Sequence, residues 1–78
     1  MDTDLEQVVA AVKEHLSEHP NAADTLEGIA SWWLSTRYPS VPRSLVEQAL
    51  TKLEDEAFVT ARRVANGTVI YALNKKTP

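Results

Sequence analysis

The chain is short, acidic and free of cysteine. It has 78 residues, a formal net charge of −3, 44% hydrophobic residues and 24% charged residues. These values favour one small globular domain and exclude disulfide bonds, cysteine-based zinc sites and thiol nucleophiles. The N-terminal stretch lacks the layout of a signal peptide, and no apolar run approaches the ~20 residues that span a bilayer. We therefore expect a cytoplasmic protein that does not enter membranes.

The two halves of the chain carry opposite charge. Residues 1–36 contain seven acidic residues and one lysine, a balance of −6, whereas residues 37–78 contain seven basic and four acidic residues, a balance of +3. A polyanion responds to the local field rather than to the net charge. The basic half therefore indicates a nucleic-acid surface, with chance clustering in a short chain as the alternative.

The first helix is expected over about residues 3–19. Its apolar residues recur every three or four positions, and Thr3 and Glu6 fit a capping box. Pro20 ends the helix, because the residue before a proline is disfavoured in the α conformation.

The end of this helix carries a motif that could indicate metal chemistry. His15 and His19, with Glu18 between them, match the H-x-x-E-H pattern of inverted zinc proteases. The histidines share a helix face, but no third ligand is evident and the chain is too short to build a protease cleft. We interpret the motif as a solvated helix end and expect no enzyme activity, no metal and no cofactor.

The second helix is expected over about residues 24–36, capped by Asp24 or Thr25 in preference to Asn21. Gly28 inside it costs ~1 kcal/mol relative to alanine, which predicts close packing at that position. Trp33 belongs to the buried stripe, and Trp32 lies about 100° round the helix from it. For Trp32 we favour a place over the edge of the core, with an anchor for a dimer or partner as the alternative.

The third helix is expected over about residues 42–56, with Ser40 as its cap and Pro42 in its first turn. Its apolar positions fall on one helical face. They are Leu45, Val46, Ala49, Leu50, Leu53 and Ala57.

Residues 58–73 are expected to form a β-hairpin, followed by a frayed tail over 74–78. Asn66-Gly67 predicts a two-residue type I′ turn. The register that follows pairs Ala65 with Thr68, Val64 with Val69, and Arg62 with Tyr71. It places Arg62 on the inner face of the hairpin and Arg63 on the outer face.

The order of three helices and a hairpin resembles the winged helix of bacterial transcriptional regulators. The family pattern of alanine-leucine, leucine-glutamate, a small residue and two apolar residues is matched by Ala49-Leu50, Leu53-Glu54, Ala57 and Phe58-Val59. The run 69–73 resembles the final wing strand. The family usually has glycine at the position of Ala57, so alanine predicts a less strained helix exit. The resemblance implies an α+β, three-helix winged helix-turn-helix domain with a C-terminal wing.

The resemblance also implies a DNA-binding surface. The third helix would enter the major groove and the wing would contact the backbone of double-stranded DNA. The base-reading residues would be Arg43, Ser44, Glu47 and Gln48, and the phosphate contacts would be Arg37, Thr51, Lys52, Arg62 and Arg63. Because a monomer with so few cations would bind DNA weakly, we expect a homodimer.

Acidic residues oppose this interpretation. Glu47 lies on the face that would approach DNA, and Glu54, Asp55 and Glu56 follow at the far end of the helix. The alternative is a winged helix adaptor that contacts proteins through Trp32 and the acidic first helix. A continuous positive surface across the third helix and the wing would favour a DNA-binding regulator, and a broken one would favour a protein partner.

Overall fold

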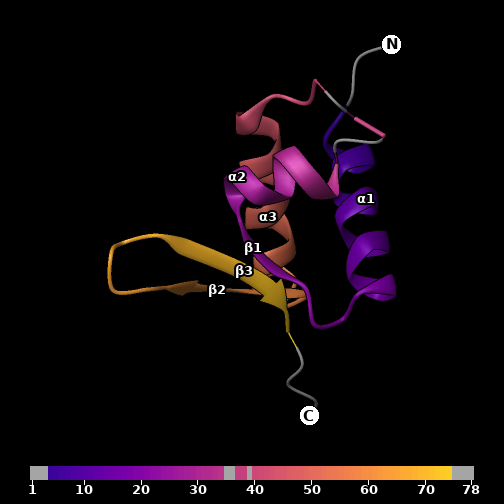
Figure 1. Cartoon of the computed structure of the whole chain (residues 1–78). Helices are drawn as coiled ribbons and strands as arrows, with labels where there is room; N and C mark the ends of the chain where they lie inside the picture. The colour runs from indigo at the N-terminus through magenta and orange to yellow at the C-terminus, as the bar shows by residue number, and fades with distance from the viewer. Residues whose placement is uncertain (1–3, 35–36, 39, 75–78) are drawn as a thin grey trace.

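The computed structural model describes residues 4–34, 37–38 and 40–74. These residues form α1 (Leu5–Glu18), β1 (Ala23–Thr25), α2 (Leu26–Gly28), the π-helical segment η1 (Ile29–Trp33), α3 (Arg43–Asp55), β2 (Val59–Arg63) and β3 (Val69–Leu73). The helices pack together, and the β2–β3 hairpin projects away from them (Figure 1). The expected α+β class is confirmed, and the arrangement is consistent with a winged helix. None of the helices described is long and apolar enough to cross a membrane.

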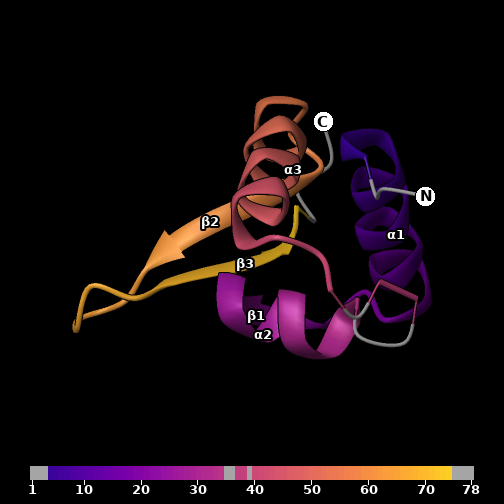
Figure 2. The same ribbon diagram turned by 90° about the horizontal axis from the view of Figure 1, so that it is seen from above.

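The core is built from the apolar stripes of α1 and α3, which lie side by side (Figure 2). Both helices bury most of the residues that the sequence pattern predicts. Leu5 and Leu45 are half-buried, and Ala57 is exposed and lies beyond the end of α3. The fully buried large side chains are Val8, Val12, Leu16, Ile29, Leu34, Val46, Leu50, Leu53 and Val59. Removing these surfaces from water supplies most of the drive to fold.

α1 begins at Leu5, two residues after the predicted start, and its cap lies one residue after the predicted cap. Asp4 is its N-cap, and Gln7 completes the capping box. The Gln7 backbone N–H donates to Asp4 Oδ1, and the Asp4 backbone N–H donates to Gln7 Oε1, each at 2.9 Å. The prediction of Thr3 and Glu6 as the box is therefore wrong, and Thr3 itself lies outside the described residues. Aspartate and glutamine can form a capping box as threonine and glutamate can, so the sequence fits a box at residues 3 and 6 or one at residues 4 and 7.

The second helical segment starts at Leu26, because the preceding residues 23–25 form the short strand β1. The predicted start at residue 24 is wrong, and the predicted end at 36 lies outside the described residues. Thr25 is the cap, as one of the two predictions has it, and its Oγ1 accepts from the Gly28 N–H at 3.1 Å. Gly28 is closely packed, since a Cβ there would overlap the Asp24 carboxylate.

α3 has Pro42 as its N-cap, and no side chain caps it. The predicted cap at Ser40 is wrong, and Pro42 stands before the first turn rather than in it. The Pro42 carbonyl instead accepts from the N–H groups of Leu45 and Val46. Proline has no N–H of its own to satisfy, which suits it to this position.

The exit of α3 is strained at Ala57, contrary to the sequence-based expectation. Ala57 has φ of 61°, in the left-handed region, and is not part of the helix. The Phe58 N–H donates to the Leu53 carbonyl at 2.9 Å, and the Ala57 N–H donates to the Glu54 carbonyl at 3.0 Å. These two bonds form a Schellman motif, which requires a left-handed residue at this position. Alanine therefore adopts the conformation that glycine adopts more easily.

The sheet has the strand order β1-β3-β2 and is antiparallel throughout. The sequence pattern does not predict β1, because Ala23 and Asp24 are depleted in strands and the three residues pair only with the distant β3. Asn74 is also held, since its backbone N–H donates to the Phe58 carbonyl at 2.9 Å. The predicted tail therefore begins after Asn74, and residues 75–78 lie outside the described residues.

The hairpin register differs by one residue from the prediction. Arg62 pairs with Ile70 and Arg63 with Val69. The Gly67 N–H donates to the Val64 carbonyl, and Gly67 is the residue with positive φ. The loop is thus a three-residue connection with a left-handed glycine rather than a type I′ turn. A one-residue shift reverses the faces, so Arg63 lies on the side of buried Val59 and Arg62 on the opposite side.

Candidate functional site

The outer face of α3 carries the residues that the winged helix resemblance would place against DNA. Arg43, Ser44, Glu47, Gln48 and Thr51 are exposed, and Lys52 is half-buried. The last four predicted positions on this helix line one shallow hollow. Its residues are Leu5, Glu47, Gln48, Thr51, Lys52, Asp55 and Tyr71. The structure therefore brings the predicted polar residues of α3 together, but it adds a second carboxylate, Asp55, to the same surface.

Arg43, the leading base-reading residue, is held by a carboxylate of α2. Its Nε donates to Glu27 Oε1 at 2.7 Å, and its Nη2 donates to Glu27 Oε2 at 2.6 Å. This is the bidentate geometry that arginine would otherwise use on guanine or phosphate. The hydrogen bond from Arg43 lowers the pKa of Glu27, and the same bond raises the pKa of Arg43.

Two further cations of the predicted DNA surface are also in ion pairs. Arg37 Nη2 lies 2.8 Å from Glu14 Oε1, and Lys52 Nζ lies 3.8 Å from Glu56 Oε2. Glu56 also receives Lys13 at 3.6 Å. The side chains in these pairs are 42–56% exposed, so the pairs contribute little stability. The pairs matter for DNA binding, since the carboxylate beside each cation reduces the positive potential that would attract a phosphate.

The pKa of Tyr71, which also lines this hollow, is raised above its ordinary value. Burial is the main cause of its raised pKa, and the negative charges of Glu54 and Glu47 raise it further. A phenolate is disfavoured where carboxylates dominate the potential. A DNA phosphate would meet the same repulsion on this side of α3.

The wing retains the remaining cations. Arg62 and Arg63 are both exposed on β2, which is an edge strand of the sheet. Within the part of the chain that the structure describes, neither forms an ion pair. The positive surface is therefore broken: it is present on the wing and neutralised along α3.

Trp32 and Trp33 are adjacent in η1 but lie in very different settings. Trp32 is 76% exposed, whereas Trp33 is half-buried and packs against the core. The prediction that Trp32 covers the core edge is therefore wrong. Both lie on a π-helical turn, in which the Leu34 N–H donates to the Ile29 carbonyl at 3.2 Å. Single π turns of this kind occur frequently at functional sites.

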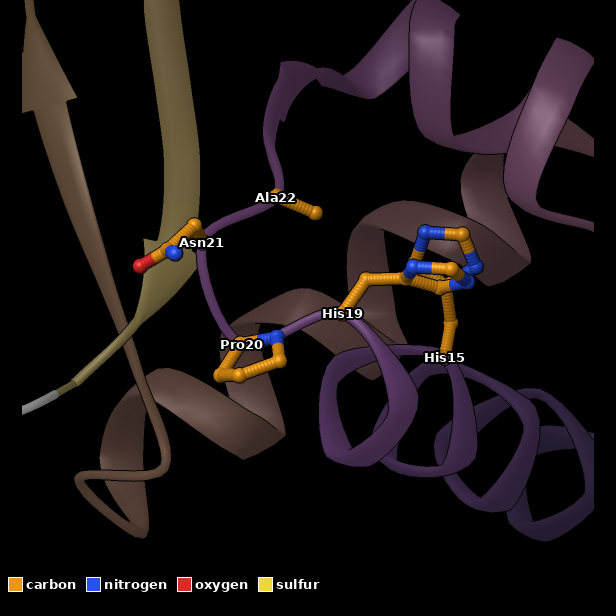
Figure 3. A pocket seen from close by; sticks show the side chains of 5 residues that line it. All are labelled: His15, His19, Pro20, Asn21 and Ala22. Carbon is orange, nitrogen blue, oxygen red and sulfur yellow. The ribbon is translucent and has the colours of Figure 1, made fainter.

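The end of α1 contains an aromatic cluster that the sequence pattern did not reveal. The ring of His15 stacks on Trp33 with centroids 4.3 Å apart, and the centroid of the His19 ring lies 4.8 Å from that of His15. Figure 3 shows the two histidine rings next to each other. Burial, followed by the charge of His19, lowers the pKa of His15, and Glu18 opposes this. The H-x-x-E-H pattern was the available signal, but it does not show that Trp33 packs on this helix.

No cluster of three or more residues suited to holding a metal ion occurs among the residues that the structure describes. Comparisons of the chain with protein-family models, with curated proteins and with solved structures found no match.

Proposed function

We propose that the chain is a winged helix adaptor of the cytoplasm that binds another protein through Trp32, rather than a reader of DNA sequence. The observation that carries the proposal is the 76% exposure of Trp32 on a helical segment anchored by buried Ile29 and Ala30. Tryptophan is enriched among the residues that contribute most to protein interfaces. A rigid element that presents it reduces the entropy lost on binding.

The charges favour a partner that differs from this chain. Trp32 belongs to the half of the chain with a balance of −6. A symmetric dimer through this half would bring like charges together, because the same patch is used twice. The complementary surface has an apolar pocket that accepts an indole, surrounded by basic residues.

The test is capture and then measurement with matched variants. Immobilised wild-type protein, the Trp32→Ala variant and the Arg62→Ala/Arg63→Ala double variant are exposed to the same lysate. The partner is a protein retained by the wild type and the double variant and lost with Trp32→Ala. Calorimetry with the purified partner should then show an affinity loss of about 30-fold or more for Trp32→Ala, as for an interface hot spot.

Two results would contradict this proposal. Sedimentation of the wild type as a dimer and of Trp32→Ala as a folded monomer would identify the partner as a second copy. An unchanged affinity of Trp32→Ala for every captured protein would show that the indole is not the anchor.

A second candidate function is double-stranded DNA binding by a homodimer, and Arg62 and Arg63 on the wing favour it. Arginines at this position would contact phosphates and set register without reading bases. The test is binding to a pool of random duplexes at ~50 mM salt, where electrostatic binding is strong. If DNA is bound, replacing both arginines with alanine should weaken binding to all sequences and reduce the salt slope by about 2.

A further inference from the structure

His15 and His19 form a pair of imidazoles at the end of α1. They lie four residues apart, so they share one face of the helix, and their ring centroids are 4.8 Å apart. Figure 3 shows the two rings next to each other. Together with Pro20, Asn21 and Ala22 they line an open pocket. Neither ring needs a large backbone movement to approach the other.

We propose that this pair binds one divalent transition-metal ion, of the class of Cu²⁺, Ni²⁺ or Zn²⁺. Imidazole nitrogens lie ~2.0–2.1 Å from such an ion, so two rings on one ion have centres about 5 Å apart at tetrahedral or square angles. The observed separation of 4.8 Å satisfies this requirement. The remaining coordination positions open to the pocket and are filled by water. The site is therefore a binding site rather than the catalytic centre of a protease.

The surroundings favour a cation at this place. His15 lies in the last turn of α1 and His19 is its C-cap, where the helix dipole is negative. Glu18 contributes a negative charge beside His15. Glu14, which lines the neighbouring pocket with His15, is already paired with Arg37. Imidazole selects borderline transition metals over Mg²⁺ and Ca²⁺, and the order of affinity places Cu²⁺ first.

The Trp33 indole provides a direct readout, since it stacks on His15 at 4.3 Å. The Trp32→Phe variant is the starting protein, so that fluorescence comes from Trp33 alone and the exposed position keeps an aromatic ring. Titration with Cu²⁺ or Ni²⁺ should quench the emission and saturate at one ion per chain. Mg²⁺ at the same concentration should leave the emission unchanged.

The matched control is His19→Gln in the same background, because His19 is exposed and does not take part in the Trp33 stack. We expect the affinity for Cu²⁺ to fall by about tenfold or more, because replacing even a residue that only hydrogen-bonds to a metal ligand lowers metal affinity by this much. Calorimetry with Zn²⁺ measures the same loss without relying on quenching. Quenching that does not saturate, or an affinity unchanged by His19→Gln, would overturn the proposal. The outcome is independent of whether Trp32 binds a protein.

Discussion

The acidic half and the basic half of the chain form ion pairs with each other. Four ion pairs form among the described residues, and three of them join residues 1–36 to residues 37–78. These are Arg37 with Glu14, Arg43 with Glu27, and Lys13 with Glu56. These pairs neutralise only part of the charge of each half. Glu14 and Glu27 are paired, whereas Asp4, Glu6, Glu18 and Asp24 form no ion pair among the described residues, so the first half keeps a net negative charge.

The two halves differ more in what they leave exposed. The second half exposes Arg62 and Arg63 on a projecting hairpin (Figure 1). The first half exposes Trp32, the only large hydrophobic side chain that is exposed among the described residues. Exposed arginines are ordinary on a protein surface, whereas an exposed tryptophan on a helix is unusual. This difference, rather than the charge balance, favours a protein partner over DNA.

The largest expected effect separates the two tryptophans. Trp33→Ala should lower the free energy of unfolding by about 2–3 kcal/mol, because the indole packs on the core and on His15. Trp32→Ala should change it by only about 0.5 kcal/mol, as for other exposed positions. Urea unfolding followed by circular dichroism measures both. A Trp32→Ala variant as unstable as Trp33→Ala would show that Trp32 is part of the core, and the proposed interface would lose its basis.

The next effect tests the helix exit that leads into the wing. Ala57→Gly should raise the free energy of unfolding by about 0.5–1 kcal/mol, since a left-handed conformation costs an L residue ~1–2 kcal/mol and part of this is offset by the greater freedom of unfolded glycine. Thermal unfolding measures the gain. Ala61→Gly is the matched control, because Ala61 lies in β2 and glycine should destabilise there. Destabilisation by Ala57→Gly would mean that Ala57 is not left-handed in solution.

The sequence predicts the elements of this fold better than their registers. Hydrophobic periodicity identifies α1 and α3, because burial of a stripe depends on spacing alone. Asn66-Gly67 predicts a hairpin, but the dipeptide suits both a two-residue loop and a three-residue loop with a left-handed glycine. The choice between the two loops decides which of Arg62 and Arg63 lies on the inner face of the hairpin. Packing of Val59 and Tyr71 in and against the core determines this choice.

The arrangement of the candidate surface is harder to predict from the sequence, because it depends on contacts between residues that are distant along the chain. Helical spacing shows that Arg43 points outward, but it cannot show that Glu27, sixteen residues earlier, lies within hydrogen-bonding distance of it. Helical spacing likewise separates Trp32 from Trp33, but it does not predict the π turn on which both lie. Contacts between distant residues, and departures from regular geometry, come from the whole fold.

A smaller effect is expected where the two halves meet at Glu27. Glu27→Gln removes the carboxylate that holds Arg43 and leaves a similar shape. We expect only a slight change in thermal stability, because both groups are exposed. We also expect no binding to random duplexes at ~50 mM salt, since Glu47 and Asp55 remain on the same surface. Salt-dependent DNA binding gained by this variant would show that the ion pair alone had masked a DNA surface.

The smallest expected effect is the pH dependence at the end of α1. The pKa of His15 is lowered from 6.5 by burial and by the charge of His19, so the unfolded chain takes up this proton first as the pH falls. The free energy of unfolding should be unaffected by His15 above pH 6.5 and should decrease as the pH drops below it. Glu27 acts in a separate window, because its lowered pKa matters only below about pH 4.5.

Nuclear magnetic resonance of the imidazole protons measures this pKa directly. His19→Gln should raise the pKa of His15, because it removes a like charge whose ring lies 4.8 Å away. The charge of Glu18 should then be the main remaining influence apart from burial, while Glu14 stays paired with Arg37. A His15 that titrates at or above 6.5 in the wild type would mean that its ring is not stacked under Trp33. In that case Trp33 would lose its contact with His15 and keep only its packing against the core, so the contrast between Trp32 and Trp33 would be smaller.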